Sequence, residues 1–239
     1  MIAGFELGCR APLLVRRERV GTAAAAWQLL YASDLHLTKA RAFLVEQLAA
    51  VAKAHRPDVV LLGGDLVDRQ NGLPVLTEAV RALAGAAPVL VVAGNHDAWC
   101  GLDRVRDAIV AGGGQWLADR DVVMSRAGRR DLQLHAVAHA SDPREALRVL
   151  VGHHPAIGQR AAAHRYDVAL AGHLHGGQCV WWERRGLLYP GAWLSRWNGL
   201  RFQLGTTTLL VSRGVADTLP VRFRCPREVV LCELSGEEL

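Results

Sequence analysis

Two histidines one residue apart, His173 and His175, follow an apolar run that ends at Ala171, and glycines come directly after them. In an extended segment alternate side chains point the same way, so the two imidazoles could face one spot. Imidazole is a common ligand of divalent transition metals. A single pair of this kind is weak evidence, because unligated histidines are common, so its weight depends on what the fold brings beside it.

Four further polar clusters lie upstream, each at the end of an apolar run. They are Asp34-Leu35-His36, Gly64-Asp65-Leu66-Val67-Asp68, Gly94-Asn95-His96-Asp97 and Gly152-His153-His154-Pro155. Functional residues of open α/β sheets lie beyond the carboxyl ends of the strands, so these clusters are expected to meet at one edge.

Together the five pieces offer a mixed set of carboxylate, amide and imidazole groups. The candidate ligands are Asp34, His36, Asp65, Asn95, His153, His173 and His175. Oxygen and nitrogen ligands suit Mn, Fe, Zn, Co or Ni, and the lack of thiolates argues against a soft-metal or iron–sulfur site. Seven ligands are too many for one metal with an open position and suit two metals that share a carboxylate. Two ions ~3.5–4 Å apart can clamp the attacking and leaving oxygens of a phosphoryl displacement.

The elements that must position these clusters alternate between strand and helix in the first half. Apolar runs at 27–32, 58–62 and 89–93 predict strands, and residues 39–55, 74–86 and 103–111 predict helices. The strands are uninterrupted in hydrophobicity, as expected when helices cover a sheet. Residues 13–15, followed by charges at 16–19, predict an edge strand.

The second half is richer in strand signals. We expect strands at 121–125, 132–138, 148–151 and 167–171, a short helix at 157–165, and hairpin strands at 187–189, 207–212 and 229–234. The predicted fold class is therefore α/β with a second sheet packed on the first. We expect a single domain over 1–239, with an N-terminal strand region (1–26), a motif-bearing core (27–178) and a β-rich C-terminal part (179–239).

Composition bounds the remaining possibilities. With 239 residues, of which 51% are hydrophobic, the chain can bury a substantial core. Five cysteines without a C-x-x-C pair argue against a disulfide framework and a zinc ribbon. The net charge of +5 suits an anionic partner without choosing among phosphate esters, nucleic acids and membrane surfaces. No signal-peptide pattern is visible near the N-terminus, so we expect a cytoplasmic protein, with peripheral membrane contact left open.

The five motifs, in this order, resemble the calcineurin-like metallophosphoesterase superfamily, whose pattern is D-x-H, G-D-x-x-D, G-N-H-[DE], a later H, and G-H-x-H. The match runs from Asp34 to His175. The G-H-x-H-G-G-Q form, with the segments 211–215 and 226–229, looks more like the YkuE/YaeI-type phosphodiesterase branch. The resemblance implies a four-layer αββα sandwich of two mixed β-sheets flanked by helices.

The resemblance also implies a role for each motif residue. Asp34, His36 and His175 would hold a first metal, and Asp65 would bridge to a second. Asn95, His153 and His173 would complete the second site. His96 would stabilise the transition state or protonate the leaving oxygen, work that suits a group of near-neutral pKa. Asp97 would orient His96, whereas Asp68 would either shape the turn or tune the metal site.

The activity implied is attack of a metal-held hydroxide on a phosphodiester or pyrophosphate bond. Alternatives of the same superfamily are a UDP-diacylglucosamine-type pyrophosphatase or another lipid-linked substrate, a nuclease and a phosphomonoesterase. The lack of a long Lys/Arg run counts against a stable nucleic-acid partner. A non-catalytic scaffold of the same fold would lack ligands or His96, and neither is missing. The sequence specifies neither the metal nor the oligomeric state.

A stretch rich in Trp and Arg follows the last motif. It contains Trp181, Trp182, Trp193 and Trp197, interleaved with Arg184, Arg185, Arg196 and Arg201. Such a surface can bind a lipid-linked phosphate, the membrane interface or stacked bases. We favour a plainer interpretation, in which a hairpin packs its aromatics on the core.

Four other histidines, His55, His135, His139 and His164, fit no ligand pattern and are expected to be ordinary surface or core residues. The stretch 139–142 departs from the glycine-bearing turn that the resemblance would place there. Substrate loops in that region are therefore expected to differ.

Overall fold

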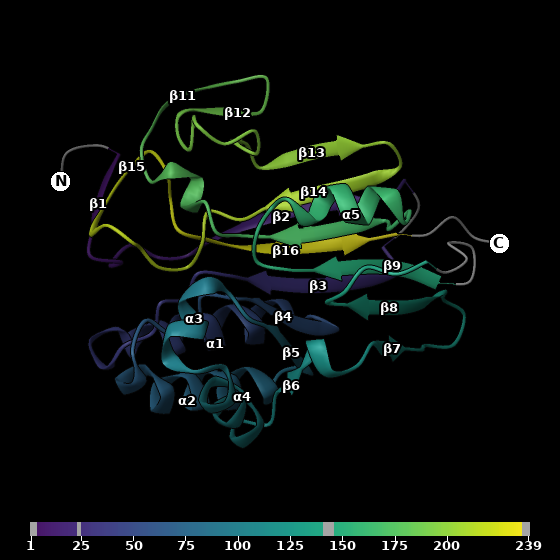
Figure 1. The fold of residues 1–239 in the computed structure, drawn as a ribbon, viewed down its shortest axis with the longest axis horizontal. Coiled ribbons are helices and arrows are strands. Elements are labelled where there is room, and N and C mark those ends of the chain that lie inside the picture. The colour runs from purple at the N-terminus through teal and green to yellow at the C-terminus, as the bar shows by residue number, and fades with distance from the viewer. Residues whose placement is uncertain (1–3, 23–24, 141–145, 236–239) are drawn as a thin grey trace.

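The computed structural model describes residues 4–22, 25–140 and 146–235, so part of the 139–142 stretch lies outside the described residues. Two six-stranded sheets face each other in the middle of the molecule, with helices on both outer faces (Figure 1). The four-layer sandwich of two mixed sheets is thus confirmed.

The first sheet carries the first three motifs. In spatial order its strands are β2 (Leu14–Val20), β16 (Glu228–Leu234), β3 (Trp27–Ala32), β4 (Val59–Gly63), β5 (Val89–Val92) and β6 (Gln115–Trp116). β3, β4, β5 and β6 are parallel, whereas β16 runs antiparallel to β3 and joins the sheet from the far end of the chain. β2 is an edge strand, as predicted, but it includes the charged residues 16–19 that were expected to follow it.

The second sheet carries the last two motifs. Its order is β13 (Arg201–Leu204), β14 (Thr207–Val211), β10 (Val168–Ala171), β9 (Ala146–Val151), β8 (Asp131–His135) and β7 (Val122–Met124). β14, β10, β9 and β8 are parallel, and β13 and β7 are antiparallel edge strands.

Helices cover the outer face of each sheet. The first sheet carries α1 (Phe43–His55), α2 (Leu73–Ala84), α3 (Asn95–Cys100) and α4 (Leu102–Ala111), and the second carries α5 (Ile157–Ala163) (Figure 1). α1 ends where Arg56 adopts a left-handed conformation before Pro57, and α2 begins with Pro74 in its first turn, as helix-end chemistry predicts. α3, the short helix directly after β5, was not predicted.

Shorter elements connect these layers. Single 3₁₀ turns are η1 (Lys39–Arg41), η2 (Gln70–Gly72), η3 (Leu117–Asp119) and η4 (His175–Gly177). Two small antiparallel sheets pair β1 (Phe5–Leu7) with β15 (Val221–Phe223), and β11 (Val180–Arg184) with β12 (Leu187–Pro190). Within the described residues, no helix is both long enough and apolar enough to cross a membrane.

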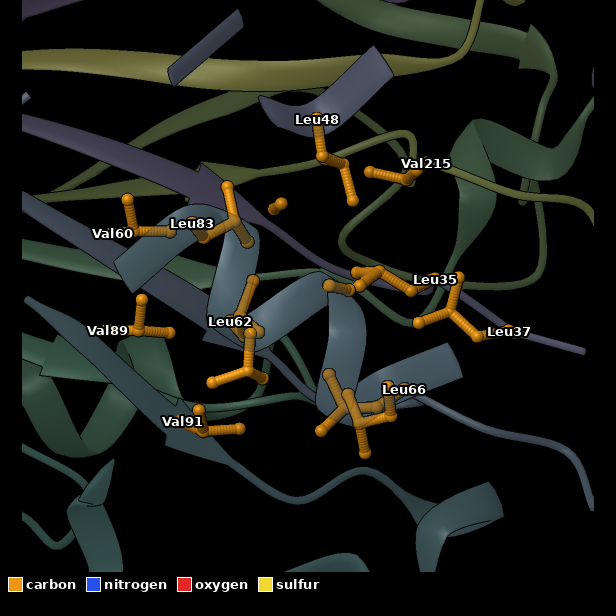
Figure 2. Packing of buried hydrophobic residues seen from close by; sticks show 14 of the residues in the cluster. Leu35, Leu37, Leu48, Val60, Leu62, Leu66, Leu83, Val89, Val91 and Val215 are labelled. Atoms are coloured by element: carbon orange, nitrogen blue, oxygen red, sulfur yellow. The ribbon is translucent and has the colours of Figure 1, made fainter. Parts of the chain in front are cut away.

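Strand alternation divides the apolar core into layers. Along β3, Leu29 and Tyr31 pack between the two sheets, whereas Leu30 and Ala32 pack under α1 and α2. This follows from the period of two along a strand and explains why both faces had to be apolar. Figure 2 shows the helix-side layer, where Leu35 joins residues from β4, β5 and the helices. The loops after the strands are therefore anchored by the same core as the strands themselves.

Candidate metal centre

The carboxyl ends of the parallel strands in both sheets converge on one place. Ala32 is level with Leu62, and Leu170 is level with Val151, so the loops that follow begin at the same height in each sheet. The sheets come together at Gly172, where a Cβ atom would lie 2.4 Å from Asp34 Oδ2. Only glycine permits this approach, which brings the last motif onto the first.

Five of the seven predicted ligands lie on left-handed backbone, which is uncommon outside glycine. Their φ angles are 55° for Asp34, 41° for His36, 51° for Asp65, 74° for His173 and 50° for His175. Each such residue costs on the order of 1 kcal/mol or more, and such strain clusters at functional sites.

Apolar neighbours hold this strained backbone in place. Leu35 and Leu37, which flank His36, are fully buried, and so is Leu66 beside Asp65 (Figure 2). Apolar and polar residues alternate along these loops, so the apolar side chains pack in the core and the polar ones lie at the site. The core therefore stabilises a loop conformation that the ligands alone would not.

The first cluster consists of Asp34, His36 and His175, all buried, with one ligand atom of each within 4.8 Å of the other two. His36 Nε2 lies 3.2 Å from His175 Nε2, which lies 3.6 Å from Asp34 Oδ1. Ligands ~2.0–2.2 Å from one ion in tetrahedral geometry are about 3.3–3.6 Å apart. These side chains are thus spaced as metal ligands before any ion is considered.

Backbone and side-chain groups behind the first cluster orient its imidazoles. His175 Nδ1 lies 3.1 Å from the Ala216 carbonyl oxygen, which leaves Nε2 for an ion. His36 Nδ1 contacts Asp68 Oδ1 at 2.5 Å. Hydrogen bonds of this kind fix the tautomer of a ligating histidine. Thr218, which the motifs did not indicate, adds a hydroxyl 3.0 Å from His175 Nε2.

The second cluster consists of Asp65, His153 and His173. His153 Nε2 is 3.2 Å from Asp65 Oδ2 and 3.1 Å from His173 Nδ1, and His153 Nδ1 contacts the Gly63 carbonyl oxygen at 2.9 Å. The spacing again matches ligands of one ion. The two clusters touch, because Asp34 Oδ1 accepts the backbone N–H of His173 at 3.0 Å.

The electrostatics of the second cluster show that it is built for positive charge. Burial alone would lower the pKa of His153, but the Asp65 and Asp34 carboxylates outweigh it and raise the pKa to about 9. Burial opposes ionisation of Asp65, yet the contact with His153 brings its pKa down to about 2. A proton shared at such a pair is what a metal ion displaces on binding.

His173 and His175 are shifted toward the neutral form that binds metal. Burial lowers the pKa of both His173 and His175. The donor set, its spacing and its charge thus fit divalent ions.

Comparison with known proteins agrees with this geometry. The family model for calcineurin-like phosphoesterases matches residues 28–177, which is more than half of the chain. The chain is a calcineurin-like phosphoesterase. It is therefore a metal-dependent phosphoesterase of the hydrolase class.

Relatives align along most of their length. Phosphodiesterase YaeI of Escherichia coli is 25% identical over 232 residues, covering 88% of this chain and 83% of that protein. An uncharacterized metallophosphoesterase of Aquifex aeolicus is 26% identical, covering 88% and 85%. The uncharacterized metallophosphoesterase YkuE of Bacillus subtilis is 24% identical, covering 88% and 79%. The resemblance predicted from the motifs is confirmed.

Asn95 is the one predicted ligand that neither cluster includes. It is the first residue of the phosphoesterase's α3, directly before His96, and its side chain is exposed. Its side chain makes no hydrogen bond to another described residue. Its role as a ligand of the second metal stays a prediction.

His96 lies over the site with a different partner from the one predicted. Its Nδ1 is 2.9 Å from Asp68 Oδ1, and its Nε2 faces Asp65 Oδ2 at 3.9 Å. Asp97 was expected to orient this ring, and the structure corrects that expectation: Asp68, at the end of G-D-x-x-D, contacts both His36 and His96. Trp99, which the motifs did not single out, packs on the His96 ring with centroids 4.2 Å apart.

Asp97 instead ties two motif loops together. Its Oδ1 accepts the backbone N–H groups of Leu66 and Val67 at 2.9 and 3.1 Å, and its Oδ2 accepts that of Gly94 at 2.8 Å. Burial raises the pKa of Asp97 to about 6, against these three hydrogen bonds. The carboxylate points away from the His96 ring because α3 turns it toward the loop after β4. Asp97 therefore positions the loop that carries Asp65.

The segment 211–215 forms the wall behind the first cluster. Gly214, with φ +78°, packs against Asp34, and a Cβ atom there would lie 2.9 Å from Asp34 Cβ. Arg213 is held by buried Glu228, and Val215 N–H donates to the Ser33 carbonyl at 2.9 Å. The C-terminal part thus supports the centre, and none of its described residues belongs to either cluster.

Proposed function

We propose that the chain is a two-metal phosphohydrolase that cleaves phosphodiester or pyrophosphate bonds. The contact between two ligand clusters, through the Asp34 carboxylate and the His173 backbone, carries this proposal. Asp34, His36 and His175 would hold one ion, Asn95, His153 and His173 the other, and Asp65 would bridge them. Such ions supply an activated water and neutralise charge on the phosphoryl group.

In this proposal, His96 handles the proton of the leaving oxygen. Its Nδ1 contacts Asp68, so Nε2 remains free and faces the Asp65 side of the centre. The Asp68 carboxylate beside Nδ1 fixes the orientation of the ring. Asp68 acts through His96 and is a positioning residue.

A hollow of about 510 Å³ adjoins the motif loops and suits an anionic substrate. It is lined by Thr38, Lys39, Ala40, Arg69 and Asn71. Lys39 and Arg69 are exposed and follow the His36 and Asp68 loops closely in sequence. The two cations suit the negative charge of a phosphate ester, and most of all that of a pyrophosphate, which carries phosphate on both sides of the cleaved bond.

The aromatic hairpin favours a substrate with an apolar part. Trp197 is buried, as the packing interpretation predicted, but Trp181, Trp182 and Trp193 are 60%, 56% and 69% exposed, so that interpretation is wrong for them. Leu194 is 83% exposed in the same region. Exposed Trp interleaved with Arg suits a lipid-linked phosphate or an anionic membrane surface.

This surface begins next to the centre. β11 starts at Val180, five residues after His175, and the Gly191 backbone packs against Gly177. A lipid-linked pyrophosphate, such as a UDP-diacylglucosamine-type substrate, would place its phosphates at the metals and its chains along the hairpin. We accordingly propose a cytoplasmic enzyme with peripheral membrane contact and no stable nucleic-acid partner.

The test compares hydrolysis of bis-p-nitrophenyl phosphate and p-nitrophenyl phosphate with Mn²⁺, after chelation, and with His96→Ala. We expect the diester to be preferred, chelation to abolish activity, and His96→Ala to lower kcat by about 10²–10⁴-fold with its metal content intact. His55→Ala, far from the centre on α1, is the matched control. Preference for the monoester would make the protein a phosphomonoesterase, and absence of both metal and activity would favour a scaffold.

A further inference from the structure

A second histidine–acid group lies apart from the phosphoesterase centre, at the carboxyl end of β8. It consists of Asp121, His135 and His139. The β7–β8 register pairs Val122 with Leu134, which places Asp121 across from His135, and His139 follows a bend after β8. β9, the strand that His153 follows, lies between β8 and β10, and no residue of this group belongs to either of the two clusters described above.

The spacing of this group matches that of the catalytic clusters. His135 Nδ1 is 3.1 Å from Asp121 Oδ1, and His139 Nε2 is 3.4 Å from Asp121 Oδ2. One ligand atom of each residue lies within 4.8 Å of the other two. These separations are close to the edge of a tetrahedron around one ion, about 3.3 Å for bonds of ~2.0 Å.

His135 lacks the partners that a buried histidine normally has. It is 2% exposed, and neither ring nitrogen makes a hydrogen bond within the described part of the chain. The Asp121 carboxylate is near Nδ1 but is not aligned with its N–H direction. Buried polar side chains nearly always find a partner, so one left without a hydrogen bond points to a missing ligand.

Neighbouring residues hold the group in shape. Arg148 donates to the His139 carbonyl oxygen at 2.6 Å, and its guanidinium lies 4.0 Å from the centroid of the Tyr166 ring. Tyr166 in turn packs edge-on against His135, with centroids 5.3 Å apart. Arg148 also donates to the His164 carbonyl oxygen at 2.6 Å. The backbone that carries His139 is therefore fixed beside His135.

We propose that Asp121, His135 and His139 bind a third divalent ion of the zinc class. Two imidazoles and one carboxylate are a nitrogen-rich set that suits Zn²⁺ and disfavours Mg²⁺ or Ca²⁺. Asp121 and His139 have side chains 46% and 43% exposed, which leaves the open side to water as a fourth ligand. The bound ion would cross-link edge strand β7 to β8 and the bend after it.

The test measures zinc content by mass spectrometry after chelation, reloading with Zn²⁺ and desalting. Wild type is compared with His139→Ala and Asp121→Asn, whose partly exposed side chains can change without opening the core. We expect each variant to hold one zinc per chain fewer than wild type. His55→Ala, which lies outside the group, is expected to keep the wild-type content.

A second readout guards against loss of zinc through misfolding. Addition of Zn²⁺ is expected to raise the Tm of wild type more than that of His139→Ala, while the two chelated proteins melt alike. Equal zinc content in wild type, His139→Ala and Asp121→Asn would overturn the proposal. So would an equal Zn²⁺-induced rise in Tm. Neither result bears on the catalytic centre, whose ligands are unchanged in every variant.

Discussion

The two histidine–acid regions of this phosphoesterase share their ligand spacing and differ in almost everything around it. At the junction of the sheets, Asp34, His36 and His175 are buried on left-handed backbone and supported by contacts to Asp68 and Ala216. Near the edge of the second sheet, Asp121 and His139 are half-exposed, and neither ring nitrogen of His135 makes a hydrogen bond in the described structure. The two regions therefore share the spacing of metal ligands, and they differ in the groups that fix those ligands in place.

The largest effect is expected at the junction of the sheets, when the carboxylate of Asp65 is removed. Asp65→Asn removes the proposed bridging charge, and we expect kcat for bis-p-nitrophenyl phosphate to fall by about 10³-fold. Asp119→Asn, an exposed acid in an ion pair with Arg106, is the control and is expected to retain activity. Steady-state kinetics in saturating Mn²⁺ check both. A fall in kcat of less than tenfold in Asp65→Asn would contradict the proposed bridging role of Asp65.

Smaller effects are expected for Asp68 and Asp97, the two carboxylates that hold the ligands and their loops in place at the junction. Asp68→Asn weakens the contacts to His36 and His96, so we expect a loss of roughly 10–100-fold in kcat/KM with little change in Tm. Asp97→Asn leaves a backbone N–H facing an amide N–H, so we expect the free energy of unfolding to fall by about 1–3 kcal/mol. Urea denaturation and kinetics on both variants separate the roles. If Asp97→Asn lost more activity than Asp68→Asn at equal stability, the original expectation for Asp97 would be restored.

The smallest effect is a pH dependence of the metal-free junction. The pKa of His153 is raised from its usual 6.5 to about 9 by Asp65 and Asp34, so the stability from this pair is fully present below pH 6.5. It is lost as pH rises through 9, and we expect the Tm of chelated protein to fall over that interval. His153→Gln should flatten the slope. Parallel Tm curves for the two proteins would contradict the pairing.

The sequence predicted most of the centre because its signals were local. Apolar runs placed Asp34, Asp65 and His173 at strand ends, and parallel strands bring such ends together. Six of the seven predicted ligands lie in the two clusters and Asn95 does not, and metal binding by all seven stays a prediction. The helices and parallel strands were predicted for the same reason, because the apolar pattern of each can be read within a few consecutive residues.

The features that the sequence did not predict depend on the direction in which side chains point in the folded chain. Whether Asp68 or Asp97 faces His96 is decided by the turn of α3, a six-residue helix without a clear pattern. Exposure of Trp181 and burial of Trp197 depend on how β11 and β12 leave the core. His135 and His139 matched no motif, because Asp121 comes beside them only through the pairing of β7 with β8.

We propose that two ions lie at the junction of the two sheets, with Asp65 between them. Anomalous diffraction from crystals grown with Mn²⁺ would locate both ions. We predict two peaks about 3.5–4 Å apart, one beside Asp34, His36 and His175 and one beside His153 and His173, with the Asp65 carboxylate contacting both. A single peak at full occupancy, or a pair without Asp65 between them, would contradict the two-metal account.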